Sequence, residues 1–247
     1  MQTTVNNAKH AINDSKIVVA LDFQEATQAL ALVNQLDPTL CKLKVGKELF
    51  TSAGPSFVEK LVDKQFDVFL DLKFHDIPNT VSKACEAATK LGVWMLNVHA
   101  SGGSAMMQAA LEGVNKGSVN VRPPYLIAVT VLTSMNQSAL NEIGIESSVD
   151  QHVLRLAKLT AQSGLHGVVC SAQEAALLRQ HINNDFLLVT PGIRPAFASL
   201  DDQSRILTPG QALAAGANYL VIGRPITQAS DPLVALSRIL QEIQSLH

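Results

Sequence analysis

The sequence predicts an α/β protein folded as a single (β/α)8 TIM barrel, and three observations favour this fold class. The chain has 247 residues, close to the roughly 250 residues typical of such a barrel. Short apolar runs alternate with helix-like stretches along the chain, as in a parallel sheet covered by helices. No linker rich in proline, glycine or serine separates the chain into halves.

Eight apolar segments are the expected strands. They are nearly continuous in apolar and β-branched residues, as strands buried on both faces should be. In chain order they are Ile17–Phe23, Cys41–Gly46, Val68–Phe74, Trp94–His99, Leu126–Leu132, Gly167–Cys170, Leu187–Thr190 and Tyr219–Gly223. An open, doubly wound sheet is the alternative that this pattern leaves open.

Helical patterns fill the gaps between these strands, and two of them begin with recognisable capping residues. Ser171-Ala-Gln-Glu174 has the form of a capping box, and Asp231-Pro232 places a capping side chain before a proline at the first helical position. The clearest helical patterns are Phe57–Lys64, Val81–Leu91, Gln151–Ser163 and Leu233–Ile243.

Composition and charge exclude several classes of protein. Hydrophobic residues make up 47% of the chain and charged residues 16%, which argues against disorder. Nineteen Lys and Arg stand against twenty-one Asp and Glu, a net charge of −2, so neither a nucleic acid nor a membrane surface is an expected partner. Cys41, Cys85 and Cys170 are scattered, which favours buried thiols in a reducing compartment over disulfides.

The chain is expected to consist of a polar N-terminal extension, residues 1–15, and a barrel domain, residues 16–247. The extension lacks the apolar core of a secretory signal, and no apolar run approaches the ~20 residues that a membrane-spanning helix needs. We therefore expect a cytoplasmic protein.

Charged residues interrupt the first three strands near their C-terminal ends, where active sites of such barrels are built. Asp22 lies at the end of the first strand and Lys44 lies in the second. In the third, Asp71 and Lys73 are two apart, so strand alternation directs both to one face, and Asp76 follows just beyond. Alternating carboxylates and ammonium groups suit proton transfer. A purely structural ion-pair network is the alternative reading.

The last two strands predict a phosphate site. Gly192 and Gly223 allow a close backbone approach, and the planar guanidinium groups of Arg194 and Arg224 suit phosphate oxygens. Loops after strands seven and eight commonly bind phosphate in this fold. The pair of arginines therefore favours a phosphorylated ligand.

Three further features of the sequence bear on the site. The polar stretch Ala196–Thr208 is expected to act as a lid. Ser101-Gly-Gly-Ser104 is a rival anion-binding loop, but no basic residue lies near it in the sequence. His75 and His99 near strand ends are expected to be hydrogen-bonded structural residues, so no metal ligand is assigned.

The chain resembles the orotidine 5′-phosphate decarboxylase family. Asp71-Leu-Lys73-Phe-His-Asp76-Ile-Pro-Asn-Thr80 is similar to the family signature, and its Asp-x-Lys-x-x-Asp element is specific to the suprafamily. The similarity continues in order through Val19-Ala-Leu-Asp22, Lys42-Leu-Lys44-Val-Gly46, Val131-Leu-Thr133-Ser134, Pro191-Gly-Ile-Arg194-Pro195 and Gly223-Arg-Pro-Ile226.

This resemblance implies a homodimer that converts orotidine 5′-phosphate to UMP and CO₂, the last step of de novo pyrimidine synthesis, without cofactor or metal. It implies that Lys73 protonates C6 and that Asp71 lies against the departing carboxylate, with Lys44 and Asp76 completing the charged network. The implied binding residues are Asp22, Lys44 and Thr80 for the ribose, Thr133 and Ser134 for the pyrimidine, and Arg194, Gln203, Gly223 and Arg224 for the phosphate. Asp76, Ile77 and Thr80 would reach the partner subunit's site.

Two alternatives remain. A sibling enzyme, a 3-keto-gulonate 6-phosphate decarboxylase or a hexulose-phosphate synthase, would resemble its relatives in holding Mg²⁺ partly through an acidic residue on the second strand. Lys44 stands there, and a protonated lysine repels a divalent cation. The other alternative is a non-catalytic phosphate- or nucleotide-binding barrel, which an inactive but tight UMP binder would support.

Overall fold

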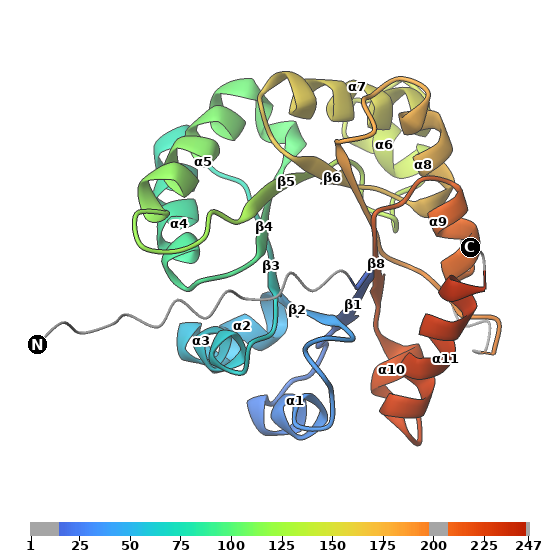
Figure 1. The fold of residues 1–247 in the computed structure, drawn as a ribbon. Coiled ribbons are helices and arrows are strands. Elements are labelled where there is room, and N and C mark those ends of the chain that lie inside the picture. Colours follow the sequence, from blue (N-terminus) through green and yellow to red (C-terminus); the bar gives the residue numbers. More distant parts are fainter. Residues whose placement is uncertain (1–14, 198–206, 246–247) are drawn as a thin grey trace, which may run out of the picture.

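Eight parallel strands close into a barrel with helices around its outside, as Figure 1 shows. The computed structural model describes residues 15–197 and 207–245. Strand order follows chain order, and β1 (Ile17–Ala20) pairs with β8 (Tyr219–Ile222) to complete the ring. This closure confirms the (β/α)8 barrel and excludes the open, doubly wound sheet.

The strands lie where apolar runs predicted them. Between β1 and β8 they are β2 (Lys42–Gly46), β3 (Val68–Phe74), β4 (Met95–His99), β5 (Tyr125–Val129), β6 (Gly167–Val169) and β7 (Leu187–Thr190). The first and fifth were expected to extend to Phe23 and Leu132, but they end earlier. Their apolar pattern continues because Leu21 and Phe23 after β1 pack with the larger core, while Val131 and Leu132 after β5 line the cavity at the mouth of the barrel.

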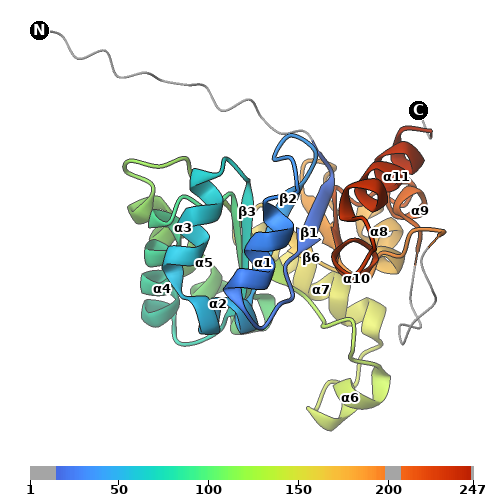
Figure 2. The same cartoon turned by 90° about the horizontal axis from the view of Figure 1, so that it is seen from below.

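Helices follow the strands around the ring. They are α1 (Ala26–Val33), α2 (Lys47–Ala53), α3 (Pro55–Asp63), α4 (Pro78–Lys90), the short 3₁₀ helix η1 (Ala100–Gly102), α5 (Gly103–Gly117), α6 (Gln137–Glu142), α7 (Val149–Gln162), α8 (Ala172–Arg179), α9 (Pro209–Ala214), α10 (Arg224–Thr227) and α11 (Pro232–Gln244). Figure 2 shows α6 projecting from the face where the strands end.

Both predicted capping arrangements are confirmed. Ser171 and Glu174 form a reciprocal capping box at the start of α8, and the Asp231 side chain accepts from the backbone N–H groups of Leu233 and Val234 in α11. No helix of residues 15–197 and 207–245 is long and apolar enough to cross a membrane.

The apolar core has two layers. The larger layer lies between the strands and the helices, and it contains the buried thiols of Cys41, Cys85 and Cys170. Burial raises the pKa of Cys41 and of Cys85 to about 12, so both are neutral thiols at physiological pH. The smaller layer fills the barrel itself and includes Val18, Ala20, Phe69, Trp94, Met95, Ile127, Val189 and Val221.

A buried ion pair closes the N-terminal end of the barrel, which we call the barrel floor. The Lys42 side chain is 1% exposed, and its Nζ lies 2.7 Å from Oδ2 of Asp67. The same ammonium lies 4.6 Å from the ring centroid of Trp94 and 5.9 Å from that of Tyr219. The carboxylate and the aromatic faces together compensate a charge that would otherwise be costly to bury.

Helices α4 and α5 pack unusually closely. A Cβ atom at Gly113 would lie 2.0 Å from the Ser82 carbonyl oxygen, so only glycine fits at this point of α5. Because α4 directly follows the loop that carries Asp76 and Ile77, this contact fixes where the loop stands at the barrel rim.

Candidate active site

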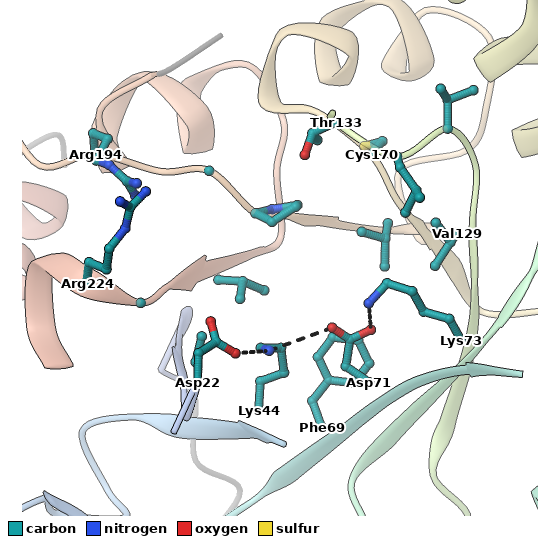
Figure 3. Close-up of a pocket in the computed structure, with 18 residues that line it drawn as sticks. Asp22, Lys44, Phe69, Asp71, Lys73, Val129, Thr133, Cys170, Arg194 and Arg224 are labelled. Carbon is teal, nitrogen blue, oxygen red and sulfur yellow. Dashed lines mark hydrogen bonds and ion pairs between the residues drawn. The ribbon is translucent and has the colours of Figure 1, made fainter. Parts of the chain in front are cut away.

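A cavity of about 340 Å³ opens at the C-terminal ends of the strands. This is the face on which (β/α)8 enzymes build their active sites. Among the expected site residues, those that line it are Asp22, Lys44, Asp71, Lys73, Thr133, Arg194, Gly223 and Arg224. Figure 3 shows their side chains converging from opposite sides of the barrel.

Four charged side chains of alternating sign form a chain along one side of the cavity. Lys44 Nζ donates to Asp22 Oδ1 at 2.8 Å and lies 3.8 Å from Asp71 Oδ2. Lys73 Nζ donates to Asp71 Oδ1 at 2.6 Å. The side chains of Lys44 and Asp71 are 10% and 13% exposed, so each charge is stabilised mainly by its neighbours. Lys73, 24% exposed, ends the chain at the cavity.

The strand that carries Asp71 and Lys73 is less regular than simple alternation implies. The pairing of β3 with β4 shifts register between Leu70 and Phe74, and Lys73 has a φ of 54°, a left-handed conformation that non-glycine residues rarely adopt. The two side chains do share one face, as expected, but a bulged strand places them there.

Asn97 in the middle of β4 is the polar residue that the site assignment lacked. It is fully buried, accepts a hydrogen bond from the Lys73 backbone N–H at 2.8 Å and donates to Asp71 Oδ1 at 2.7 Å. Its signal in the sequence is an amide within an otherwise apolar strand, Met-Leu-Asn-Val-His. The sequence does not reveal to which neighbouring strand this amide forms its hydrogen bonds.

The opposite end of the cavity is built by the loops after β7 and β8. Arg194 is buried and Arg224 begins α10, and Figure 3 shows their guanidinium groups pointing toward one another. Gly192 has a φ of 79°, a turn that glycine adopts without strain. Two cations held side by side in this way favour an anion bound to both. Gly103 and Ser104 begin α5, and the rival Ser101–Ser104 loop does not line the cavity.

The wall between these two ends is largely apolar. Phe69, Val129, Val169 and Val221 contribute from the strands, together with the loop residues Val131 and Leu132. Cys170 also lines the wall, and burial raises the pKa of its thiol, so it stays uncharged at physiological pH. A cavity with an apolar wall and a few convergent polar groups suits a flat organic ligand.

Several expected site residues do not line this cavity. Asp76, Ile77 and Thr80 are exposed on the rim, and so is Ser134. Asp76 Oδ1 accepts from the Ile77 backbone N–H, and among the described residues of one subunit no ion pair joins Asp76 to the charged chain. The reason is that the chain turns outward after Phe74 to begin α4. Gln203 lies outside the described residues, as does most of the Ala196–Thr208 lid segment.

The rings of His75 and His99 lie near the mouth with their centroids 5.6 Å apart and their planes tilted by 40°. Burial, followed by the nearby charges of His75, Lys47 and Lys73, lowers the pKa of His99. The imidazole is therefore neutral at pH 7. Within residues 15–197 and 207–245, no group of three His, Cys, Asp or Glu side chains is arranged to hold a metal ion.

Comparison with known proteins places this geometry in a family. A sequence profile described as "Orotidine 5′-phosphate decarboxylase / HUMPS family" matches residues 15–239. A protein from Pseudoalteromonas atlantica named "Orotidine 5′-phosphate decarboxylase" is 60% identical over 228 residues, which are 92% of this chain and 98% of that protein. A protein of the same name from Nitrosococcus oceani is 60% identical over 232 residues, covering 94% and 99% of the two chains.

A solved structure agrees in fold and in sequence. The crystal structure of orotidine 5′-phosphate decarboxylase from Lactobacillus acidophilus matches with a TM-score of 0.84 and 41% identity, over 93% of this chain and 99% of that chain. Both the profile and the relatives span nearly all of the described barrel, so the chain belongs to the orotidine 5′-phosphate decarboxylase / HUMPS family.

Proposed function

We propose that this protein decarboxylates orotidine 5′-phosphate to UMP and CO₂, the last step of de novo UMP synthesis. The observation that carries the proposal is the Lys73–Asp71 pair, 2.6 Å apart, at the end of the cavity opposite Arg194 and Arg224. The substrate has the same polarity, with a phosphate at one end and a carboxylated ring at the other. The name shared by the relatives points to the same reaction.

The substrate contacts are assigned by combining cavity geometry with family resemblance. Arg194, Gly223 and Arg224 would hold the phosphate, with Gln203 from the lid segment. Thr133 would contact the pyrimidine, and Ser134 would join it there. Asp22 and Lys44, bonded to each other at 2.8 Å, would hold the ribose hydroxyls. Because these contacts are remote from the reacting carbon, their binding energy can position it and stabilise a strained complex.

The proposed chemistry places Lys73 beside C6 of the pyrimidine. The bond from C6 to the carboxylate breaks, CO₂ departs, and the electron pair remains on C6. No adjacent π-system delocalises this carbanion, so a fixed ammonium group is its natural stabiliser. A proton then moves from Lys73 Nζ to C6, giving UMP, and solvent returns a proton to the lysine.

Asp71 would contribute by repulsion in the bound substrate. Two carboxylates about 4 Å apart repel by roughly 4 kcal/mol at an effective dielectric of about 20. Loss of neutral CO₂ moves the negative charge from the carboxylate to C6, beside the Lys73 ammonium, and so relieves this stress, which is a form of ground-state destabilisation. Lys44 and Asn97 keep the Asp71 carboxylate in place through its two oxygens.

The proposal assigns no metal or cofactor to this step. Lys44 occupies the position on β2 where a Mg²⁺-dependent sibling needs an acidic ligand, and its ammonium lies between Asp22 and Asp71. A cation placed there would be repelled by Lys44. Lys73 supplies the positive charge that a metal would otherwise bring to the carbanion.

A homodimer would complete each site. Asp76, Ile77 and Thr80 are exposed on the rim of their own subunit, and the Ile77 side chain is 67% exposed, so this rim is accessible to a partner subunit. We propose that this rim enters the partner subunit's cavity and that Asp76 extends the Lys44–Asp71–Lys73 chain there.

The activity is tested by following the ultraviolet absorbance of orotidine 5′-phosphate after adding purified protein, with and without EDTA. The expected result is rapid loss of substrate that EDTA does not affect and that Lys73→Ala abolishes. Lys90→Ala is the matched control, since Lys90 is an exposed lysine that only pairs with Glu86 on the same helix. No turnover by the wild-type protein, or turnover lost with EDTA, would reject the proposal.

The shared site is tested by mixing two inactive variants, Lys73→Ala and Asp76→Ala. If each site combines Lys73 of one subunit with Asp76 of the other, random reassortment gives hybrid dimers with one intact site each. Equal mixing should then restore about one quarter of the wild-type sites, since half of the dimers are hybrids. Absence of any recovery after confirmed subunit exchange would place Asp76 outside the shared site.

A further inference from the structure

The backbone that aims Lys73 into the cavity requires support from a neighbouring strand. In the β3–β4 pairing, Leu70 faces Leu96 and Phe74 faces Val98, so Asp71, Leu72 and Lys73 together oppose the single residue Asn97. Lys73 also has a φ of 54°, a backbone conformation that is strained for a non-glycine residue. Such a conformation persists only where surrounding contacts enforce it.

The Asn97 side chain supplies those contacts. Its Oδ1 accepts the Lys73 backbone N–H at 2.8 Å, where the bulge removes the regular ladder bond. Its Nδ2 donates to Asp71 Oδ1 at 2.7 Å. The fully buried Asn97 amide thus holds both the backbone of Lys73 and the carboxylate of Asp71.

The chemistry of this position suits asparagine. Asp71 Oδ1 receives both the Asn97 amide and Lys73 Nζ, while Oδ2 faces Lys44. A neutral amide can donate to the carboxylate and accept from the backbone without changing the net charge of the chain. An aspartate would add a like charge at hydrogen-bond distance, and alanine would remove both bonds.

We propose that Asn97 is a positioning residue for the reaction, which orients Asp71 and Lys73 without touching the substrate. This inference rests on the proposed decarboxylase function. Asn97 does not line the cavity, so it acts only through its two partners. Its loss should therefore lower kcat strongly while leaving KM, which the phosphate and ribose contacts dominate, nearly unchanged.

The key variant is Asn97→Asp, which keeps the size of the side chain and the acceptor for the Lys73 N–H. Above neutral pH, two ionised carboxylates would face each other and kcat should fall about 30-fold or more. Lowering the pH should restore part of kcat, because one proton shared between the carboxylates re-creates the donor. The other titratable groups around this pair are Lys44 on β2, Lys73 on β3 and His99 on β4, with His75 near His99.

Two controls separate positioning from general stability. Asn97→Ala should lose kcat to a similar extent without recovery at low pH. Asn218→Asp changes an amide before β8 that accepts from Leu188 N–H and from Arg179, and it should leave the pH profile of kcat unchanged. The inference would be overturned if the pH profile of kcat for Asn97→Asp ran parallel to that of the wild type. It would also be overturned if the substitution changed only KM.

A measurement independent of turnover keeps this inference separate from the function on which it rests. Amide hydrogen exchange at Lys73 should be about tenfold or more faster in Asn97→Ala than in the wild type, because the bond to Oδ1 is lost. If the wild-type protein fails to decarboxylate the substrate, the proposed function fails and this exchange rate decides whether Asn97 holds the Lys73 backbone. Unchanged protection at Lys73 in a folded Asn97→Ala protein would refute that role.

Discussion

Removing the carboxylate of Asp67 should destabilise the protein far more than removing the ammonium group with which it pairs. Asp67→Ala removes the carboxylate that lies 2.7 Å from the Lys42 ammonium, whose side chain is only 1% exposed. Breaking a buried ion pair in this way costs about 3 to 5 kcal/mol. Because the Asp67 side chain is 18% exposed and water can partly replace it, the lower end of this range is expected.

Lys42→Met removes the buried charge itself. Methionine keeps most of the side-chain volume, and replacing a buried charge by an apolar group is often neutral or stabilising. The variant loses the contact with the Trp94 ring at 4.6 Å, which contributes about 0.5 to 2 kcal/mol. We therefore expect a net change within about 1 kcal/mol of zero, and we expect Lys42→Met to rescue most of the Asp67→Ala loss in the double variant.

The assay is urea unfolding followed by tryptophan fluorescence. The chain contains one tryptophan, and Trp94 is the residue beside Lys42, so the probe reports directly on the barrel floor. Protein concentration must be held constant, so that any subunit association affects all variants equally. Equal losses in the two single variants, or a loss below 1 kcal/mol in Asp67→Ala, would refute the reasoning.

Three other outcomes are expected. Arg224→Ala should lower kcat/KM at least about 100-fold while changing the free energy of unfolding by less than about 1 kcal/mol; unchanged kcat/KM, measured by substrate absorbance, would exclude Arg224 as a phosphate ligand. Gly113→Ala should destabilise the protein by about 1 to 3 kcal/mol in urea unfolding, since its Cβ would lie 2.0 Å from the Ser82 carbonyl; wild-type stability would show that α4 and α5 can separate. Because the pKa of His99 is lowered in the folded state, the unfolded state binds more protons below about pH 6.5, and the free energy of unfolding should fall as pH decreases through that range. His99→Asn should reduce this pH dependence, and an identical slope in both proteins would contradict the assignment.

The pattern of apolar residues along the sequence was sufficient to predict the strands of the barrel. β3 and β7 have the bounds that their apolar runs predicted, and the caps of α8 and α11 form as expected. These features depend on local sequence, so neighbouring residues are enough to specify them. The early ends of β1 and β5 were missed because an apolar loop at the barrel mouth has the same composition as a buried strand.

The candidate site could be predicted only in part. Charged residues at strand ends identified Asp22, Lys44, Asp71 and Lys73, because unpaired charges are too costly to leave in an apolar strand. Within one subunit Asp76 lies apart from this charged chain, because the backbone turns outward after Phe74, and its place in the partner subunit's site stays a prediction. The roles assigned to these residues stay predictions until the variants above are measured.

The sequence by itself determined the barrel, the identity of its charged residues and the family to which the chain belongs. Only the tertiary structure decided how Lys73 is aimed, because its left-handed backbone and the register shift of β3 exist only where β3 pairs with β4. The buried amide of Asn97 meets that strand across 24 residues of chain. A contact of this kind depends on the relative placement of two strands, which no local pattern specifies.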